Sequence, residues 1–270
     1  MFGHGGLRFS PGLLVFGVLA QIGTAQTSAS LTSDARAVAL ISQAQSALTG
    51  GIGAADLSLN SNAIWAVGKT YETGTATLKV KGTSKARLDI SAGSVIRSEI
   101  RNDTADTDGA WIGADGTTHK LALHNCQTLP AWFSPATFMT AMTGANVVLQ
   151  YVGQETRNSI AVDHIRYFQR TAGLYKSQRA AALFAQLSQT EIYLDAASHL
   201  PRVIVYNSHP EQDQDTNFPV EVRFAAYKVT NGINAPSHIQ RLLNGSLNLD
   251  LTITSIQVNS GVPDSIFALQ

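Results

Sequence analysis

The chain has 270 residues, of which 14% are charged, and its 19 lysines and arginines balance 19 aspartates and glutamates. A charged fraction below the usual quarter, with no basic surplus, argues against nucleic acid or an anionic membrane surface as the main partner. The single cysteine, Cys126, excludes an internal disulfide and a zinc site built from cysteines. The chain must therefore rely on a hydrophobic core. Its length suffices for one large β-rich domain or two small ones.

The N-terminal residues have the pattern of an export signal. Arg8 supplies a positive charge, and a short apolar run at 13–22 precedes the small residues Gly23 and Ala25, which suit cleavage before Gln26. The run is too short to cross a bilayer, which needs about 20 residues. We predict a signal peptide at 1-25, a flexible leash at 26-33 and an exported protein, either periplasmic or extracellular. An uncleaved anchor or a misplaced start codon is the alternative.

A helix is predicted directly after the leash. Thr32 or Ser33 would cap it, and Asp34 would lie in its first turn. Apolar residues recur at helical spacing up to the pair Gly50-Gly51, which ends the helix. They are Val38, Ile41, Ala44 and Leu48. This apolar stripe needs a surface to pack against, and the only candidate is a sheet. No interdomain linker follows, so we predict a single domain over 34-270.

Residues 54–123 alternate between apolar and polar side chains, which is typical of half-buried strands. The segments 76–80 and 86–90 place leucine, valine and isoleucine on one side and charged residues on the other. Ile96, Ser98 and Ile100 likewise alternate with three charged residues. The pair Asp115-Gly116 predicts a type I′ turn between strands 109–114 and 117–123. The result is an antiparallel meander with one charged face and one apolar face.

Further strands are predicted at 146–153, 158–168, 190–195, 201–206, 218–227, 238–243 and 246–258. A helix is predicted at about 177–188. In the last strand the alternation slips at Thr254-Ser255, which indicates a β-bulge or a change of packing layer. The acidic stretch 207–217 is predicted to be a solvated loop, and the tail around Phe267 is predicted to cap an end of the sheet.

Three groups of residues suggest metal binding, and each has a simpler interpretation that we favour. His124 and Cys126 would share one face of a strand, but His119 would point away, which leaves two ligands where zinc needs three or four. Two acidic groups suggest calcium and are more simply read as a turn and a solvated loop. They are Asp103, Asp106, Asp108 and Asp115, and then Glu211, Asp213 and Asp215. We therefore predict no metal, no cofactor and no catalytic residue. A hydrolase with a dispersed Ser/His/Asp triad remains a minor alternative.

The segment 129–144 interrupts the strands with a short helix rich in aromatic residues and methionine. One interpretation is ordinary core. The other is a lid of adaptable side chains over a hydrophobic pocket.

The order of these motifs resembles the LolA/LolB-like superfamily of outer-membrane lipoprotein carriers and related LppX-type proteins. The resemblance rests on the capped helix, the meander with Trp111 before Asp115-Gly116, the segments 191–195, 200–206 and 218–222, and the run 251–259 ending in 264–267. It implies a curved antiparallel half-barrel, mostly β, with a few helices packed on its concave face. It also implies a cavity for acyl chains and a carrier, not an enzyme. Where the lipoprotein carrier has an Arg-Pro pair that latches the lid, this chain has Lys81-Gly82. We therefore carry over only the fold and the ligand class.

We predict a non-catalytic protein that binds a lipid or another hydrophobic small molecule, acts as a monomer and does not bind nucleic acid. An envelope protein is a second candidate partner. The alternative is a structural or protein-interaction module whose concave face is filled by its own helices. The predicted cavity residues are Leu78, Val80, Leu88, Ile90, Trp132, Phe133, Phe138, Met139 and Met142.

Overall fold

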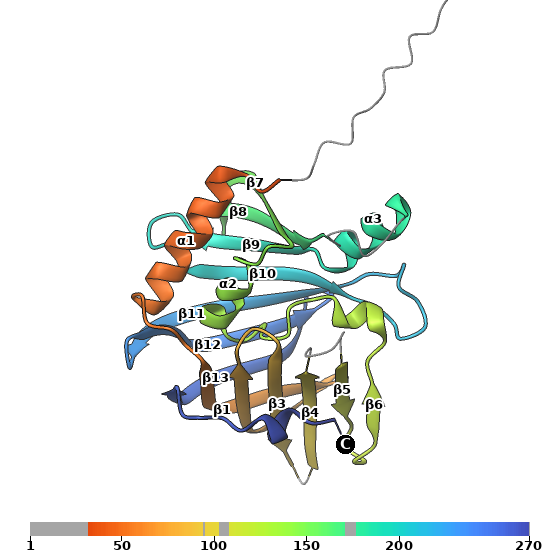
Figure 1. The fold of residues 1–270 in the computed structure, drawn as a ribbon. Helices are drawn as coiled ribbons and strands as arrows, with labels where there is room; N and C mark the ends of the chain where they lie inside the picture. Colours follow the sequence, from red (N-terminus) through yellow and green to blue (C-terminus); the bar gives the residue numbers. More distant parts are fainter. Residues whose placement is uncertain (1–31, 94, 103–107, 171–176, 270) are drawn as a thin grey trace, which may run out of the picture. The chain divides into compact units, whose positions relative to one another are not determined.

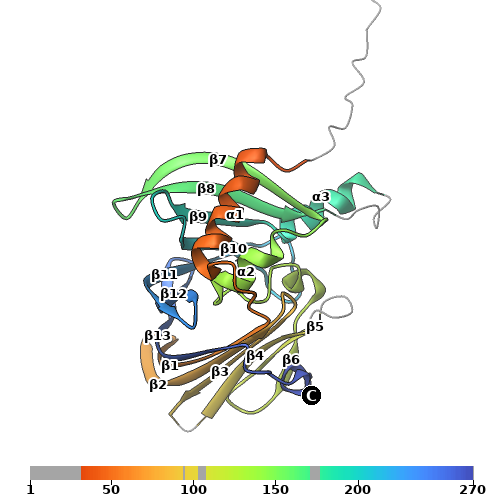
Figure 2. The ribbon, with the colours of Figure 1, turned by 60° about the vertical axis from the view of Figure 1, so that its left-hand side comes forward.

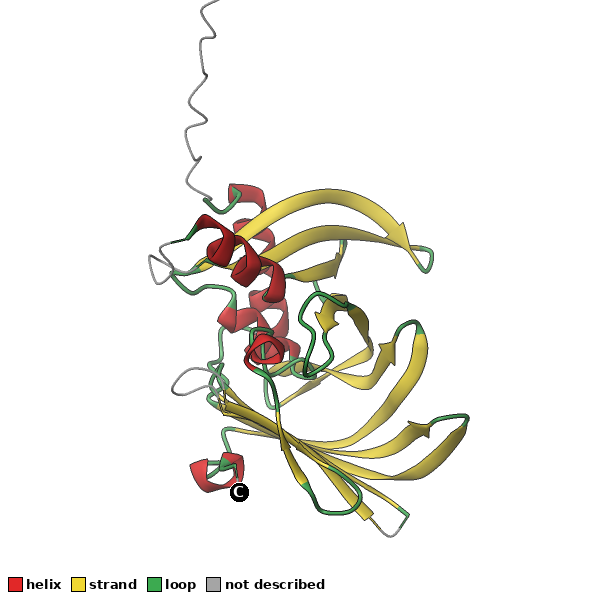
Figure 3. Ribbon diagram, turned by 90° about the vertical axis from the view of Figure 1, so that its right-hand side faces the viewer, coloured by secondary structure: helices red, strands yellow, loops and turns green. Residues whose placement is uncertain are grey.

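The computed structural model describes residues 32–93, 95–102, 108–170 and 177–269. These residues form one antiparallel sheet in the strand order β6-β5-β4-β3-β2-β1-β13-β12-β11-β10-β9-β8-β7, together with three α-helices and two 3-10 helices (Figure 1). The sheet curves without closing into a barrel, and Figure 3 shows this curvature along the strands. The predicted fold class is confirmed.

The strands are β1 (Asp56–Val67), β2 (Thr70–Lys81), β3 (Lys85–Ala92), β4 (Val95–Asn102), β5 (Asp108–Ile112), β6 (Thr118–Lys120), β7 (Val147–Arg157), β8 (Ile160–Gln169), β9 (Thr190–Asp195), β10 (Pro201–Ser208), β11 (Phe218–Thr230), β12 (Ile233–Leu243) and β13 (Ser246–Val258). The helices are α1 (Ala35–Thr49), η1 (Leu123–Cys126), α2 (Pro135–Ala141), α3 (Gln178–Leu187) and η2 (Asp264–Phe267). Within the described ranges, none of these helices has the length and apolar character needed to span a bilayer.

The strand order requires the segment that connects β6 to β7 to pass across the sheet. These two strands are adjacent in the sequence but form opposite edges of the sheet, so residues 121–146 must connect one edge to the other. We call this segment the crossover. It contains η1 and α2, and α2 contacts both α1 and β12. Figure 2 shows α1 and α2 together on the hollow side of the sheet, as predicted.

The concave face of the sheet carries the hydrophobic core. Leu59, Leu78 and Leu88 lie opposite one another on β1, β2 and β3, and all three are buried. The helix α1 covers this face with a stripe of buried residues, namely Ala37, Leu40, Ile41, Ala44 and Leu48. Val38, which was predicted to lie on the stripe, is 43% exposed. The buried residues at positions 37, 41, 44 and 48 repeat at helical spacing and form one face of the helix, and Val38 lies outside that face.

The cap of α1 differs from the prediction. Asp34 is the N-cap, and its carboxylate accepts hydrogen bonds from the backbone N–H groups of Arg36 (2.7 Å) and Ala37 (3.4 Å). Ser33 is not available for capping, because its hydroxyl donates to the Val147 carbonyl (3.3 Å) and accepts from the N–H of Leu149 (3.1 Å). The helix therefore begins directly after Ser33 and Asp34, which are hydrogen-bonded to the edge strand β7.

The predicted bulge in β13 is confirmed. Asn60 of β1 pairs with Ser255 and the next residue, Ser61, pairs with Ile253, so Thr254 has no partner across the β1 ladder. The hydroxyl of Thr254 instead donates to the carbonyl of Asn60 (3.1 Å). The extra residue accounts for the slip in the apolar pattern.

The predicted type I′ turn is wrong. Gly116 has a positive φ of 79°, whereas Asp115 does not, and a type I′ turn needs positive φ at both residues. The N–H of Gly116 donates to the Gly113 carbonyl (3.0 Å), and the N–H of Gly113 donates to the Thr117 carbonyl (3.1 Å). This pattern is a longer hairpin loop with glycine in the left-handed position. The following strand, β6, ends at Lys120, and η1 occupies positions that were predicted to be extended.

The charged residues of β4 face the opposite way from the prediction. Leu88 of β3 pairs with Glu99, and Ile90 pairs with Arg97, so these charged side chains lie on the concave face with the core. Ile100 and Ser98 are buried on the outer face. There η2, at the end of the chain, contacts β3 and β4.

The C-terminal segment therefore covers the outer face of β3 and β4. Phe267 is fully buried, and Arg87 donates a hydrogen bond from Nη1 to the Ile266 carbonyl (2.8 Å). Lys81 and Lys85 both form ion pairs with Asp264, at 3.0 and 2.8 Å. The C-terminal segment thereby buries Ser98 and Ile100 on the outer face of β4. The charged residues of β4 lie on the opposite, concave face.

Gly74 marks a close approach within the curved sheet. A Cβ at this position would lie 1.9 Å from the Ser91 carbonyl oxygen and 2.9 Å from the Ala92 Cα. Both are backbone atoms, so only a shift of the strands would relieve the clash.

We expect Gly74→Ala to lower the free energy of unfolding by about 1–3 kcal/mol, as overpacking does. Chemical denaturation measures this change. Gly53→Ala is the matched control, because a Cβ there meets nothing within 4 Å. Equal stability of the two variants would contradict the close approach of β2 and β3.

Candidate functional site

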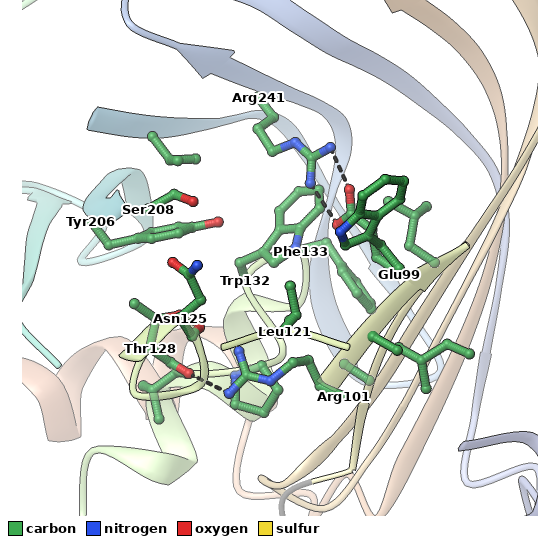
Figure 4. A pocket seen from close by; sticks show the side chains of 18 of the residues that line it. Glu99, Arg101, Leu121, Asn125, Thr128, Trp132, Phe133, Tyr206, Ser208 and Arg241 are labelled. Atoms are coloured by element: carbon green, nitrogen blue, oxygen red, sulfur yellow. Dashed lines mark hydrogen bonds and ion pairs between the residues drawn. The ribbon is translucent and has the colours of Figure 1, made fainter. Parts of the chain in front are cut away.

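A cavity of about 330 Å³ lies between the concave face and the crossover. Its walls come from β3, β4 and β5 on one limb of the sheet, from β10 to β13 on the other limb, and from the crossover (Figure 4). Trp111 and Leu243 line it and are 39% and 41% exposed, which places them at its mouth. The cavity thus joins two parts of the sheet that are remote in strand order.

One side of the cavity is apolar. Leu88 of β3, Trp132 and Phe133 of the crossover, and Val220 of β11 line it, and all four are buried. The rings of Trp132 and Phe133 meet edge to face with centroids 5.4 Å apart. The two aromatic rings are thereby fixed against each other and form a rigid wall.

An ion pair crosses the cavity from one limb to the other. Arg241 of β12 donates from Nη1 and Nη2 to the two carboxylate oxygens of Glu99 on β4, each at 2.7 Å. Its Nε donates to Asn248 (3.0 Å), and its guanidinium carbon lies 4.8 Å from the centroid of a Trp132 ring. Burial alone would lower the pKa of Arg241, but the charge and hydrogen bonds of Glu99 outweigh it and raise that pKa. The Arg241 guanidinium therefore stays charged.

Two hydroxyl groups lie on the other limb. Tyr206 and Ser208 alternate along β10 and share the concave face with Val220, which pairs with Tyr206. Figure 4 shows the Tyr206 hydroxyl directed into the cavity, towards Trp132 and Arg241. Burial raises the pKa of Tyr206 to about 12, so the phenol stays protonated at neutral pH and is a hydrogen-bond donor.

The floor of the cavity is built by contacts between η1 and the loop after β10. Asn125 donates from Nδ2 to the His209 carbonyl (2.8 Å) and accepts the His209 N–H at Oδ1 (2.9 Å). Glu211 accepts the N–H of Ala122 (2.5 Å), and His124 Nε2 lies 2.9 Å from the Pro210 carbonyl oxygen. These four contacts bind the crossover to the end of β10.

These contacts correct the prediction that 207–217 is a solvated loop. Asn207 and Ser208 belong to β10, and His209 is buried. The ring of His209 lies with Nδ1 3.1 Å from the Thr216 carbonyl oxygen, and burial lowers its pKa. Only the part around Asp213 and Asp215 is exposed, as predicted.

The nine predicted cavity residues fall into two groups. Leu88, Trp132 and Phe133 line the cavity. The other six belong to the buried core and are 3% exposed or less, namely Leu78, Val80, Ile90, Phe138, Met139 and Met142. Whether any of the nine contacts a ligand stays a prediction. Glu99, Arg241 and Tyr206 were not predicted to line the cavity, because strand alternation alone does not show which polar residues of a strand face the interior.

The histidines considered for zinc are held in separate places. His119 stacks on Trp111 with centroids 3.9 Å apart, whereas His124 and Cys126 lie in η1 instead of a strand. Asp103 and Asp106 lie outside the described residues. Throughout the described ranges, no three histidine, cysteine or acidic side chains gather closely enough to hold a metal ion.

The fold and the cavity together define a class of structure, an open antiparallel half-barrel with helices and a crossover over its hollow face. Several solved structures are similar to it in fold, of which three are described below. A domain assigned by its name to outer-membrane lipoprotein sorting in Vibrio parahaemolyticus has 14% identity and a TM-score of 0.52, over 84% of this chain and 94% of that one. A LolA superfamily protein from Nitrosomonas europaea has 12% identity and a TM-score of 0.53, over 86% and 97%.

The third structure is a DUF1329 family protein from Desulfovibrio piger, with 10% identity and a TM-score of 0.51 over 86% of this chain and 96% of that one. No family model matches the sequence, and no curated protein matches it. At these identities the likeness shows the fold alone. It confirms that the chain has the LolA-type fold that the sequence motifs resemble.

The Arg241–Glu99 pair should contribute measurably to stability. The Arg241 side chain is 11% exposed and that of Glu99 is 35%, so the pair is only partly desolvated. We expect Glu99→Gln to lower the free energy of unfolding by about 1–2 kcal/mol, less than the full cost of orphaning a buried charge. The double variant Glu99→Gln/Arg241→Met should lose less than the sum of the two single changes.

Denaturation of the two single variants and the double variant measures this coupling. Glu221→Gln is the control, since Glu221 pairs with the more exposed Arg223. Additive single changes would show that the two residues do not interact.

His209 should make the protein less stable on acidification. Its folded-state pKa is lowered, so below the unfolded value of about 6.5 the unfolded chain binds a proton that the native state resists. The stability that its neutral form contributes is present above that value and is lost as the pH falls through the folded pKa. We expect His209→Asn, which can retain a donor for Thr216, to reduce the fall in melting temperature between about pH 7.5 and 5.5. His119→Asn, which removes an exposed histidine, is the control for the loss of one imidazole.

Proposed function

We propose that this protein is an exported, non-catalytic binding protein that holds one lipid or other hydrophobic ligand in the cavity under the crossover. The observation that carries the proposal is the cavity itself, with a buried wall at Leu88, Trp132 and Phe133 and a mouth at Trp111 and Leu243. Concave, mostly apolar hollows with a few fixed polar groups are where proteins bind small molecules.

The size of the cavity limits the ligand. A volume of about 330 Å³ is at the low end of the usual range for ligand sites, roughly 300–1,000 Å³. We therefore infer a single acyl chain or a small amphiphile. Each buried methylene contributes about 0.8 kcal/mol, so a chain of about ten gains roughly 8 kcal/mol before the cost of association.

The solved structures with this fold support the proposal at the level of class. One of them is assigned by its name to outer-membrane lipoprotein sorting, and the similarity covers 94% of that chain. Export to the periplasm or the extracellular space is supported by the leader predicted at 1-25. An envelope protein that loads or unloads the ligand is a further candidate partner.

One observation favours a second candidate function. The helices α1 and α2, with the aromatic and methionine side chains of the crossover, fill much of the concave face, and six of the predicted cavity residues are fully part of that core. A structural or protein-interaction module of the envelope would need only this filled face. Uptake of a ligand by the cavity beside this filled face distinguishes the binding protein from the structural module.

Uptake of an uncharged fluorescent probe tests the proposal. N-phenylnaphthylamine has no charge at neutral pH and fluoresces in apolar surroundings. We expect saturable binding by the mature chain, and about a tenfold loss of affinity in Leu88→Phe, because the larger ring fills the cavity; a tenfold change is about 1.4 kcal/mol.

Leu78→Phe is the matched control. Leu78 pairs with Leu88 on the neighbouring strand and is equally buried, but it does not line the cavity. Its affinity should stay near that of the wild type. No probe uptake by the wild type would contradict the proposal and favour the filled module. Equal losses in both variants would contradict the assignment of the cavity as the site.

A further inference from the structure

The polar side of the cavity contains a hydroxyl group that nothing in the described chain uses. Tyr206 lines the cavity on β10, and no residue in the described ranges forms a hydrogen bond with its hydroxyl. By contrast, the hydroxyls of Tyr151 and Tyr227 bind Asp163 (3.0 Å) and the Pro201 carbonyl (2.7 Å). A tyrosine in a cavity normally has a partner for its hydroxyl, so the partner of Tyr206 is expected to come from outside the chain.

The groups around this hydroxyl favour an acceptor over a donor. Tyr206 remains protonated and can donate, and Ser208 adds a second hydroxyl on the same face of β10. Arg241 uses one N–H from each of its three nitrogens for Asn248 and Glu99, which leaves two of the five N–H groups of a guanidinium.

The charges near Tyr206 point the same way. The positive charges of Arg241 and Arg101 lower the pKa of the Tyr206 hydroxyl, whereas the negative charge of Glu99 raises it. Arg101 is held in place because its Nη2 donates to the carbonyls of Cys126 (2.5 Å) and Thr128 (3.0 Å), as Figure 4 shows in part. The two N–H groups that Arg241 leaves unused, beside the Tyr206 hydroxyl, favour an anionic group over a cationic one at this point.

Resting on the function proposed above, we infer that the ligand is a single-chain amphiphile with an anionic head, whose carboxylate or phosphate oxygen accepts the Tyr206 hydroxyl. The chain lies along Leu88, Trp132 and Phe133, and the head lies between Tyr206, Ser208 and Arg241. Tyr206 thereby selects the head group, while the apolar wall selects only length and bulk. A hydrogen bond to a charged group is stronger than one to a neutral group, so the hydroxyl discriminates between heads.

Displacement of N-phenylnaphthylamine by amphiphiles with the same twelve-carbon chain tests this inference. Dodecanoate and dodecyl phosphate carry anionic heads, dodecanol is neutral and dodecyltrimethylammonium is cationic. All are used at pH 8, where the carboxylate is ionised and Tyr206 is not. We expect the two anions to displace the probe at least about tenfold better than dodecanol, and the cation to be the weakest.

The variant Tyr206→Phe isolates the hydroxyl. We expect it to weaken dodecanoate about tenfold and dodecanol less than about threefold, with no loss of melting temperature because no hydrogen bond within the protein is removed. Tyr227→Phe is the control. It removes the bond to Pro201, so it should lower the melting temperature and leave the preference for anionic heads unchanged.

The outcomes separate this inference from the proposed function. Failure of the probe itself to bind would overturn both. Normal probe binding with equal displacement by dodecanoate and dodecanol, or an unchanged preference in Tyr206→Phe, would overturn the anionic head alone. Inorganic phosphate without a chain should not displace the probe. Displacement by phosphate at the concentration of dodecyl phosphate would show a site for a free anion instead of an amphiphile.

Discussion

The path of the crossover is the constraint on which the rest of this structure depends. The strands β6 and β7 follow each other in the chain but lie at opposite edges of one open sheet, so the crossover has to traverse the concave face. It contributes Trp132 and Phe133 to the cavity wall, and η1 binds it to the end of β10 through Asn125. The crossover and α1 cover different parts of the concave face. Neither segment covers the whole face, and the cavity lies between the crossover and the sheet.

The ion pair between Arg241 and Glu99 offsets the cost of placing charged side chains on the concave face. A concave sheet with charged residues in its interior loses their hydration, and each charge needs a partner to offset that cost. The bidentate geometry from β12 to β4 supplies the partner and directly connects the two limbs, which the sheet and the crossover also join. The charges that remain near Tyr206 then create a donor-rich end beside an apolar wall, which suits a ligand with two unlike ends.

The concave face has features that fit both candidate functions, the ligand-binding protein and the structural module. Six of the predicted cavity residues are closely packed core, whereas Leu88, Trp132 and Phe133 border open space. A filled core and a small cavity are therefore both present on one face, and neither α1 nor α2 contributes a residue to the lining of the cavity. A protein with this fold can adjust the space for a ligand by changing a few side chains of the crossover.

Most of the local structure could be predicted from the amino-acid sequence. The alternation along strands, the helical stripe of α1 and the bulge at Thr254 follow from periodicity, because these depend on neighbours within one element. The half-barrel class was implied by a resemblance to a known superfamily. The inward direction of Glu99 was decided only by the tertiary structure: strand alternation is symmetric, and which face is buried depends on η2, far along the chain, covering the other side. The meeting of Arg241 with Glu99, 142 residues apart, and the position of Tyr206 at the cavity likewise depend on register and curvature.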